Sequence, residues 1–172
     1  MILGMTTSTF TLLHVLLSLA GIGSGFVVLY GFLTAKRLDG WTAAFLTTTV
    51  ATSVTGFLFP IEKITPGLVL GILSLALLAV AILSRYQLHL SGGWRRVYVI
   101  SAMVALYFNV FVAIVQSFEK VPALRAAAPT GKEPPFLVSQ LIVMAAFVWA
   151  TFIATRRFRE EPIVHVHSQR AA

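Results

Sequence analysis

Histidines are the residues of this chain best suited to chemistry, because an imidazole can bind haem or a metal ion. His14 lies inside a long uncharged stretch, His89 follows the third such stretch, and His165 and His167 form an H-x-H sequence near the C-terminus. The predicted topology places His14 and His89 at opposite ends of the molecule, so they cannot hold one haem within a single chain. The H-x-H pair offers two ligands at most, and a disordered segment is the simpler interpretation. We therefore predict no metal site.

Amide and phenol groups at a similar predicted depth to His14 define a candidate ligand pocket. Gln116 lies near the end of the fourth uncharged stretch and Gln140 near the start of the fifth, while Tyr107 and Asn109 lie deeper and could form the floor. The candidate ligand-binding residues are thus His14, Asn109, Gln116, Gln140 and Tyr107. In the alternative interpretation each group forms a hydrogen bond between helices, worth about 0.6 kcal/mol on average within a membrane.

The carboxylates argue against two classes of function. All six acids lie in loops, at the ends of uncharged stretches or in the C-terminal tail: Asp39, Glu62, Glu119, Glu133, Glu160 and Glu161. A proton- or sodium-coupled carrier usually keeps an acid near the middle of the membrane, and a hydrolase needs paired acids or a Ser-His-Asp combination at one depth. We predict no catalytic residues and favour a protein without enzymatic activity.

Five long uncharged stretches must position these side chains. Each supplies the roughly 20 residues that a hydrocarbon core about 30 Å thick requires. The composition, 58% hydrophobic and 11% charged, is too apolar for a soluble domain. The sequence therefore predicts an all-α fold, a polytopic membrane helix bundle, as one domain over residues 1–159 with a disordered tail over 160–172. The expected transmembrane helices are residues 10–33, 41–60, 66–84, 97–118 and 136–155.

Small residues spaced four apart indicate where helices approach closely. Gly21 and Gly25 in the first stretch, and Gly67 and Gly71 in the third, form smooth surfaces of this kind. They could form a homodimer seam or pack within the bundle, and packing within the bundle is the favoured interpretation.

Basic residues indicate the orientation. Nine of the 13 Lys and Arg residues fall on one side of the predicted helices: Lys36, Arg37, Arg85, Arg95, Arg96, Arg156, Arg157, Arg159 and Arg170. The positive-inside rule makes that side cytoplasmic, which puts the N-terminus outside and the C-terminus inside. The basic residues sit at segment ends rather than in a stripe, so we predict no nucleic-acid partner. The expected partners are the lipid bilayer and either a second membrane protein or a second copy of the chain.

The segment LHLSGGWRR offers a candidate contact on the cytoplasmic side. Its residues His89, Trp94, Arg95 and Arg96 could bind an anionic lipid headgroup or a partner's acidic loop. The alternative is an ordinary loop that only sets the topology.

Three features suggest a resemblance to a known group of proteins: this segment, His14 and the TSVTGF sequence of residues 52–57. Over residues 13–118 the chain resembles small uncharacterised multi-pass inner-membrane proteins of bacteria, which often place a histidine in the first helix and a His…Trp-Arg pattern before the fourth. The resemblance implies a multi-pass protein of the inner membrane. The His-Arg pair expected at the start of the second helix is replaced by Gly40-Trp41-Thr42, which argues against an inherited haem or redox role.

The sequence is compatible with three functions. The leading one is a non-catalytic binding or accessory subunit of the membrane. One alternative is a membrane redox component that binds haem or quinone near His14. The other is a permeation pathway for a small neutral solute, lined by Asn109, Tyr107 and the two glutamines.

Overall fold

The computed structural model describes residues 2–60 and 66–158. All five helices predicted from the sequence are present, with ends within about one turn of those expected: α1 (Thr7–Leu33), α2 (Asp39–Gly56), α3 (Pro66–Ile82), α4 (Trp94–Lys120) and α6 (Pro134–Arg157). A π-helical turn, Leu83–Gln87, extends α3, and a short helix that was not predicted, α5 (Pro122–Ala127), precedes α6. The described residues contain no β-strand, which confirms the all-α prediction. The predicted disordered tail and the H-x-H pair lie outside the described residues.

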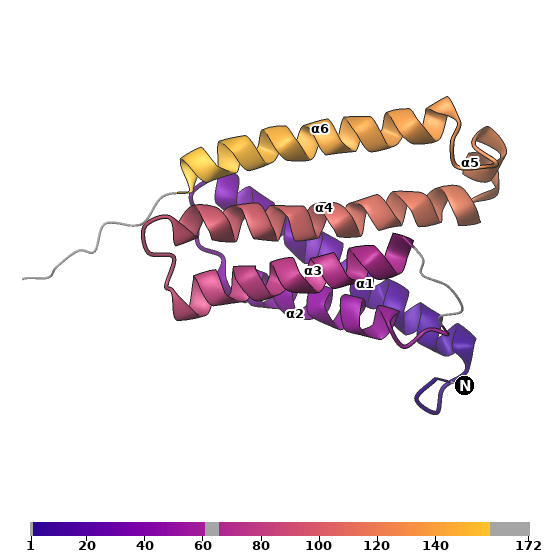
Figure 1. Cartoon of the computed structure of the whole chain (residues 1–172), viewed down its shortest axis with the longest axis horizontal. Helices are drawn as coiled ribbons and strands as arrows, with labels where there is room; N and C mark the ends of the chain where they lie inside the picture. Colours follow the sequence, from indigo (N-terminus) through magenta and orange to yellow (C-terminus); the bar gives the residue numbers. More distant parts are fainter. Residues whose placement is uncertain (1, 61–65, 159–172) are drawn as a thin grey trace, which may run out of the picture.

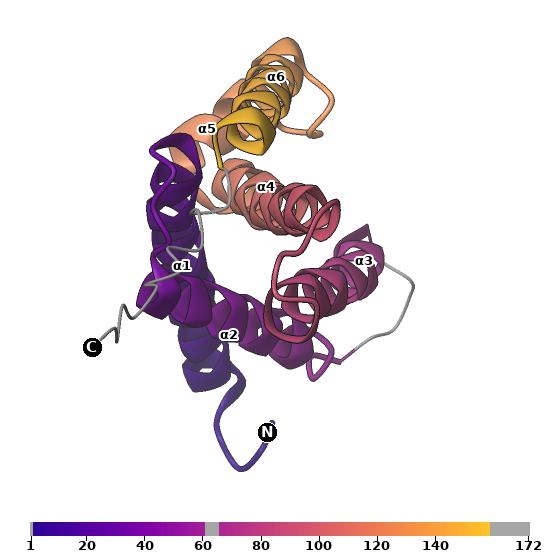
Figure 2. The same cartoon turned by 90° about the vertical axis from the view of Figure 1, so that its left-hand side faces the viewer.

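The long helices lie side by side, and the chain reverses direction at each connection (Figure 1). The start of α1 and the end of α6 are therefore at opposite ends of the bundle. Viewed from the end, α4 lies between α3 and α6, and α2 lies beside α1 (Figure 2). α1 packs mainly on α2, whereas α4 contacts α1, α3 and α6. α6 contacts only α4 and α1 extensively, so it is the least enclosed long helix of the described bundle.

An aromatic cluster joins the helices at the end of the bundle where the chain leaves α6. The ring of Phe32 in α1 lies 5.5 Å from that of Tyr98 in α4 and 5.1 Å from that of Phe158, which follows α6. All three side chains are buried. Edge-to-face aromatic pairs of this kind add about 0.5–1.5 kcal/mol each beyond the area they bury. The cluster fixes the end of α6 against α1 and α4.

Glycines of α1 serve the packing of this bundle. Gly21 is buried, and a Cβ atom at this position would lie 3.2 Å from Thr49 Oγ1 in α2 and 3.7 Å from Asn109 Nδ2 in α4. The face predicted from glycine spacing thus packs against helices of its own chain, as the favoured interpretation expects.

Four helical segments are long and apolar enough to cross a membrane: Thr7–Leu33, Pro66–Gln87, Trp94–Lys120 and Pro134–Arg157. The chain thus has the architecture of an integral membrane protein. α2 is not among the four, because threonines lower its hydropathy: Thr42, Thr47, Thr48, Thr49, Thr52 and Thr55. The count of five spans and the orientation stay predictions.

A carboxylate holds together the turn that precedes α6. Glu133 is the residue before the helix, and it accepts hydrogen bonds from the Thr130 hydroxyl (2.8 Å), the Thr130 N–H (3.0 Å) and the Lys132 N–H (3.0 Å). Desolvation raises the pKa of Glu133, but these hydrogen bonds outweigh it and lower the pKa from 4.5 to about 2.

Because the folded pKa is depressed, this contribution to stability is complete above pH 4.5 and is lost as the pH falls toward 2. We expect the amide protons of Thr130 and Lys132 to exchange with solvent more rapidly below about pH 3 than their intrinsic acid dependence accounts for. Amide hydrogen exchange in detergent micelles measures this. Glu133→Gln, whose amide does not titrate, should lack this added pH dependence, and a Glu133→Gln protein with the wild-type pH profile would contradict the assignment.

Candidate functional site

His14 lies near the start of α1 and bonds to the far end of α2. Its Nδ1 atom is 2.9 Å from the Thr55 hydroxyl oxygen, and its ring packs edge-on against Phe59 at a centroid distance of 5.3 Å. The Thr55 hydroxyl itself donates to the Ala51 carbonyl at 2.7 Å. The Thr55 oxygen therefore accepts its bond from Nδ1–H, which assigns the proton of the neutral imidazole to Nδ1. The other ring nitrogen, Nε2, is left as the acceptor.

Asn109 lies near the middle of α4 and bonds to α2. Its Nδ2 atom donates to the Thr49 hydroxyl at 3.3 Å, at the point where Gly21 of α1 approaches both residues. Thr49 is fully buried. Asn109 therefore joins α4 to α2 inside the bundle.

The other three predicted ligand-binding residues have different neighbours. Gln140 of α6 donates to the Phe111 carbonyl of α4 at 3.3 Å, and Gln116 donates to the Glu119 carboxylate one turn later at 3.1 Å. The Tyr107 ring packs 5.6 Å from that of Phe147 in α6.

No hydrogen bond within the described residues joins any two of these five side chains. His14 and Asn109 face α2, whereas Tyr107 faces α6 and Gln140, which belongs to α6, faces α4. The pocket that the sequence predicts around them stays a prediction. What the contacts establish is that His14, Asn109 and Gln140 each tie two helices together.

A second group of polar residues lies at the opposite end of the bundle. Arg85, in the π-helical turn, forms an ion pair with Asp39 at the start of α2. Its Nη1 atom also donates to the Tyr98 hydroxyl at 3.3 Å, and the guanidinium lies 5.3 Å from the centre of that ring. Four further residues complete a cleft of about 200 Å³ around this pair: Arg37, Tyr86, His89 and Leu90.

Sequence reasoning missed the Asp39–Arg85 pair, although it placed both residues at the same end. The available signal was an acid among basic residues on the predicted cytoplasmic side. A lone acid at that depth is expected to pair with one of the arginines.

The predicted lipid or partner contact lies at this same end. His89 is exposed in a backbone conformation with φ of +50°, and Trp94 begins α4 with 44% of its surface exposed. Arg95 donates through Nη1 to the Thr155 carbonyl at 3.4 Å, and Arg96 is exposed. Arg157 donates in the same way to the Leu33 carbonyl at 3.4 Å. Arginines thus donate hydrogen bonds to carbonyls at the C-terminal ends of α6 and α1. A cation at this end of a helix also interacts favourably with the helix dipole.

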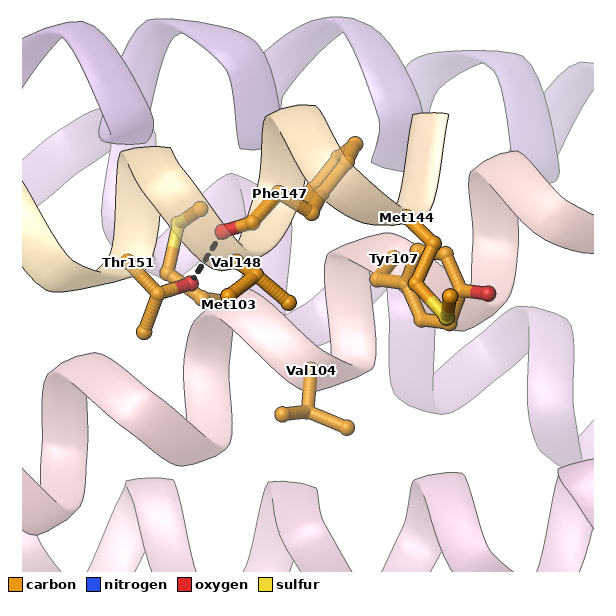
Figure 3. A pocket seen from close by; sticks show the side chains of 7 residues that line it. All are labelled: Met103, Val104, Tyr107, Met144, Phe147, Val148 and Thr151. Atoms are coloured by element: carbon orange, nitrogen blue, oxygen red, sulfur yellow. Dashed lines mark hydrogen bonds between the residues drawn. The ribbon is translucent and has the colours of Figure 1, made fainter. Parts of the chain in front are cut away.

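A second hollow of about 220 Å³ lies between α4 and α6 (Figure 3). Met103, Val104 and Tyr107 line it from α4, and Met144, Phe147, Val148 and Thr151 line it from α6. The Thr151 hydroxyl donates to the Phe147 carbonyl at 2.7 Å. The lining is therefore almost wholly hydrocarbon. In the described part of the chain no group of three or more His, Cys, Asp or Glu residues is placed to hold a metal ion.

Comparison of the chain with protein-family models, with curated proteins and with solved structures finds no match. The class of protein therefore follows from the fold alone, which is a bundle of long apolar helices with the architecture of an integral membrane protein.

Proposed function

We propose that this chain is a non-catalytic accessory subunit of a bacterial inner membrane, with five transmembrane helices, the N-terminus outside and the C-terminus in the cytoplasm. α2 completes the five spans. Its 18 residues are about 27 Å long at a rise of about 1.5 Å per residue. Four of its polar side chains face the bundle, since Thr42, Thr49, Thr52 and Ser53 are all buried, whereas Thr47 is exposed. A low hydropathy is compatible with a membrane span when the polar face meets other helices.

The arginine-rich end supports the orientation. The described basic residues at that end are Lys36, Arg37, Arg85, Arg95, Arg96, Arg156 and Arg157, whereas the other end has Lys120, Arg125 and Lys132. The positive-inside rule assigns the first set to the cytoplasm.

Single cysteines test whether α2 spans the membrane and which end is cytoplasmic. The sequence contains no cysteine, so only the introduced one can react. Gly40→Cys lies at the start of α2, where a Cβ atom meets nothing within 4 Å, and Pro60→Cys lies just beyond its end at an exposed position. A membrane-impermeant maleimide added to intact cells should label Pro60→Cys, and it should label Gly40→Cys only after permeabilisation. Labelling of both from one side would show that α2 does not span, and the reverse pattern would invert the orientation.

The exposed face of α6 is the observation that carries the accessory role. α6 buries Gln140, Phe147, Ala150 and Ala154 against the bundle. Exposed apolar residues form the opposite face. They are spaced alternately four and three residues apart, as in contacts between two packed helices: Val138, Ile142, Ala145, Trp149 and Phe152. Trp149 is 66% exposed. This face fits a transmembrane helix of a partner protein, whereas His14, Asn109 and Gln140 are engaged in bonds within the bundle.

Photo-crosslinking in the native membrane tests this role. With benzoylphenylalanine in place of Trp149, we expect one protein adduct of discrete mass. The control is the same substitution at Ile72 of α3, which is 56% exposed but lies outside this face. Adducts with lipid alone at Trp149, or the same adducts at both positions, would rule out a helix partner. An adduct of twice the chain's mass would identify the partner as a second copy.

A further inference from the structure

The groove between α4 and α6 opens toward the surroundings of the bundle. Val148 and Met144, which line it, are 66% and 43% exposed. The side chains in Figure 3 line this hollow, which has a volume of about 220 Å³ and an almost purely hydrocarbon lining. A helix with its side chains is about 10 Å across, so even one of its turns occupies more than this volume. A segment of one acyl chain fits it.

Arg96 lies on the face of α4 that lines the groove, nearer to the arginine-rich end of the bundle. From Arg96 through Ile100 to Val104 and Tyr107, the residues follow the spacing of one helix face. Ile100 is 46% exposed, so the face stays open between the groove and the arginine. Arg96 precedes Val104 by about 12 Å at a rise of about 1.5 Å per residue. Arg96 is exposed, and it makes no hydrogen bond or ion pair with other residues that the structure describes.

The neighbouring Arg95 fixes this end of the groove. Its Nη1 atom donates to the Thr155 carbonyl, one turn beyond Thr151 at the edge of the groove. The bond holds the start of α4 against the end of α6. Arg96 thus lies on the same face of α4 as the hydrocarbon groove. Its separation from the groove is similar to that between the phosphate of a lipid and the upper part of its acyl chain.

We propose that Arg96 and the α4–α6 groove bind one anionic phospholipid, with its phosphate at Arg96 and one acyl chain between Met103 and Met144. A net negative headgroup is preferred to a zwitterionic one because the arginines at this end attract it. The site requires the membrane location of the bundle but not the helix partner proposed above, since the exposed face around Trp149 is a different side of α6.

Native mass spectrometry tests the site with the full chain, reconstituted in vesicles of equal parts phosphatidylglycerol and phosphatidylcholine and then released in mild detergent. We expect the wild-type protein to retain one phosphatidylglycerol in preference to phosphatidylcholine. Arg96→Gln should lower that preference about fivefold, the effect typical of one basic residue near an anionic lipid. Met144→Trp, which fills the groove, should lower retention of both lipids.

Arg125→Gln is the matched control, since it removes an exposed arginine at the other end of the bundle. It should leave the preference unchanged. Equal effects of Arg96→Gln and Arg125→Gln would show that surface charge in general, rather than a specific site, attracts the lipid. An unchanged preference in Arg96→Gln would overturn the proposed site. Wild-type retention of both lipids by Met144→Trp, in a protein that elutes as a folded bundle, would exclude the groove.

Discussion

Gly25→Val is expected to lower the free energy of unfolding of the bundle by about 3 kcal/mol, the upper end of the usual cost of overpacking. Gly25 is buried where α1 approaches both α2 and α4. A Cβ atom there would overlap the Cδ1 methyl of Leu106 and lie 3.0 Å from two ring carbons of Phe45. Both side chains are 1% exposed, so neither can move without displacing the core. The melting temperature in detergent, followed by size-exclusion chromatography of the heated protein, measures the loss.

Gly23→Val is the matched control in the same helix. A Cβ atom at Gly23 would meet nothing within 4 Å, so the same added side chain should change stability by less than about 0.5 kcal/mol. Gly21→Ala should fall between the two, because its Cβ would lie 3.2 Å from Thr49 Oγ1. Equal losses at Gly23 and Gly25 would show that α1 needs backbone flexibility at its glycines rather than close contact with α2 and α4.

The helices could be predicted because charge spacing in an apolar chain marks their ends directly. Lys36 to Asp39, for example, separates two stretches that each match the thickness of a membrane. The short helix α5 gave no such signal. It has only six residues and begins at Pro122 within a proline-containing loop, where local backbone geometry decides the structure.

The site could be predicted less well because depth along a helix does not give direction around it. Tyr107 and Asn109 are two residues apart, and two residues turn a helix by about 200°. They were expected to form one pocket floor, yet Tyr107 packs on Phe147 of α6 and Asn109 bonds to Thr49 of α2. Helices that are apolar on all sides carry no periodicity to show which face meets which neighbour. The Asp39–Arg85 pair was missed for the same reason, because the sequence places both residues at one end of the bundle but does not show which arginine is directed toward Asp39.

Arg85→Ala is expected to lower the free energy of unfolding by about 2 kcal/mol, because it removes a buried side chain and leaves the Tyr98 hydroxyl without its donor. The Arg85 side chain is only 8% exposed, and it connects three elements through Asp39 and Tyr98. Its removal deprives the fully buried Tyr98 of a hydrogen-bond donor and its ring of the guanidinium that lies over it. The melting temperature in detergent again measures the loss.

The Asp39 side of the pair should behave differently. Asp39 is 77% exposed, and in Asp39→Asn the amide oxygen still accepts from Arg85, so the expected loss is about 1 kcal/mol. Arg85→Ala combined with Asp39→Asn should cost no more than Arg85→Ala alone, because both changes remove the same contact. Additive losses would mean that Asp39 stabilises the bundle through another partner. The unequal single losses would place the structural role of this cluster in the buried guanidinium, which ties the π-helical turn to α2 and α4, rather than in the charge pair at the surface.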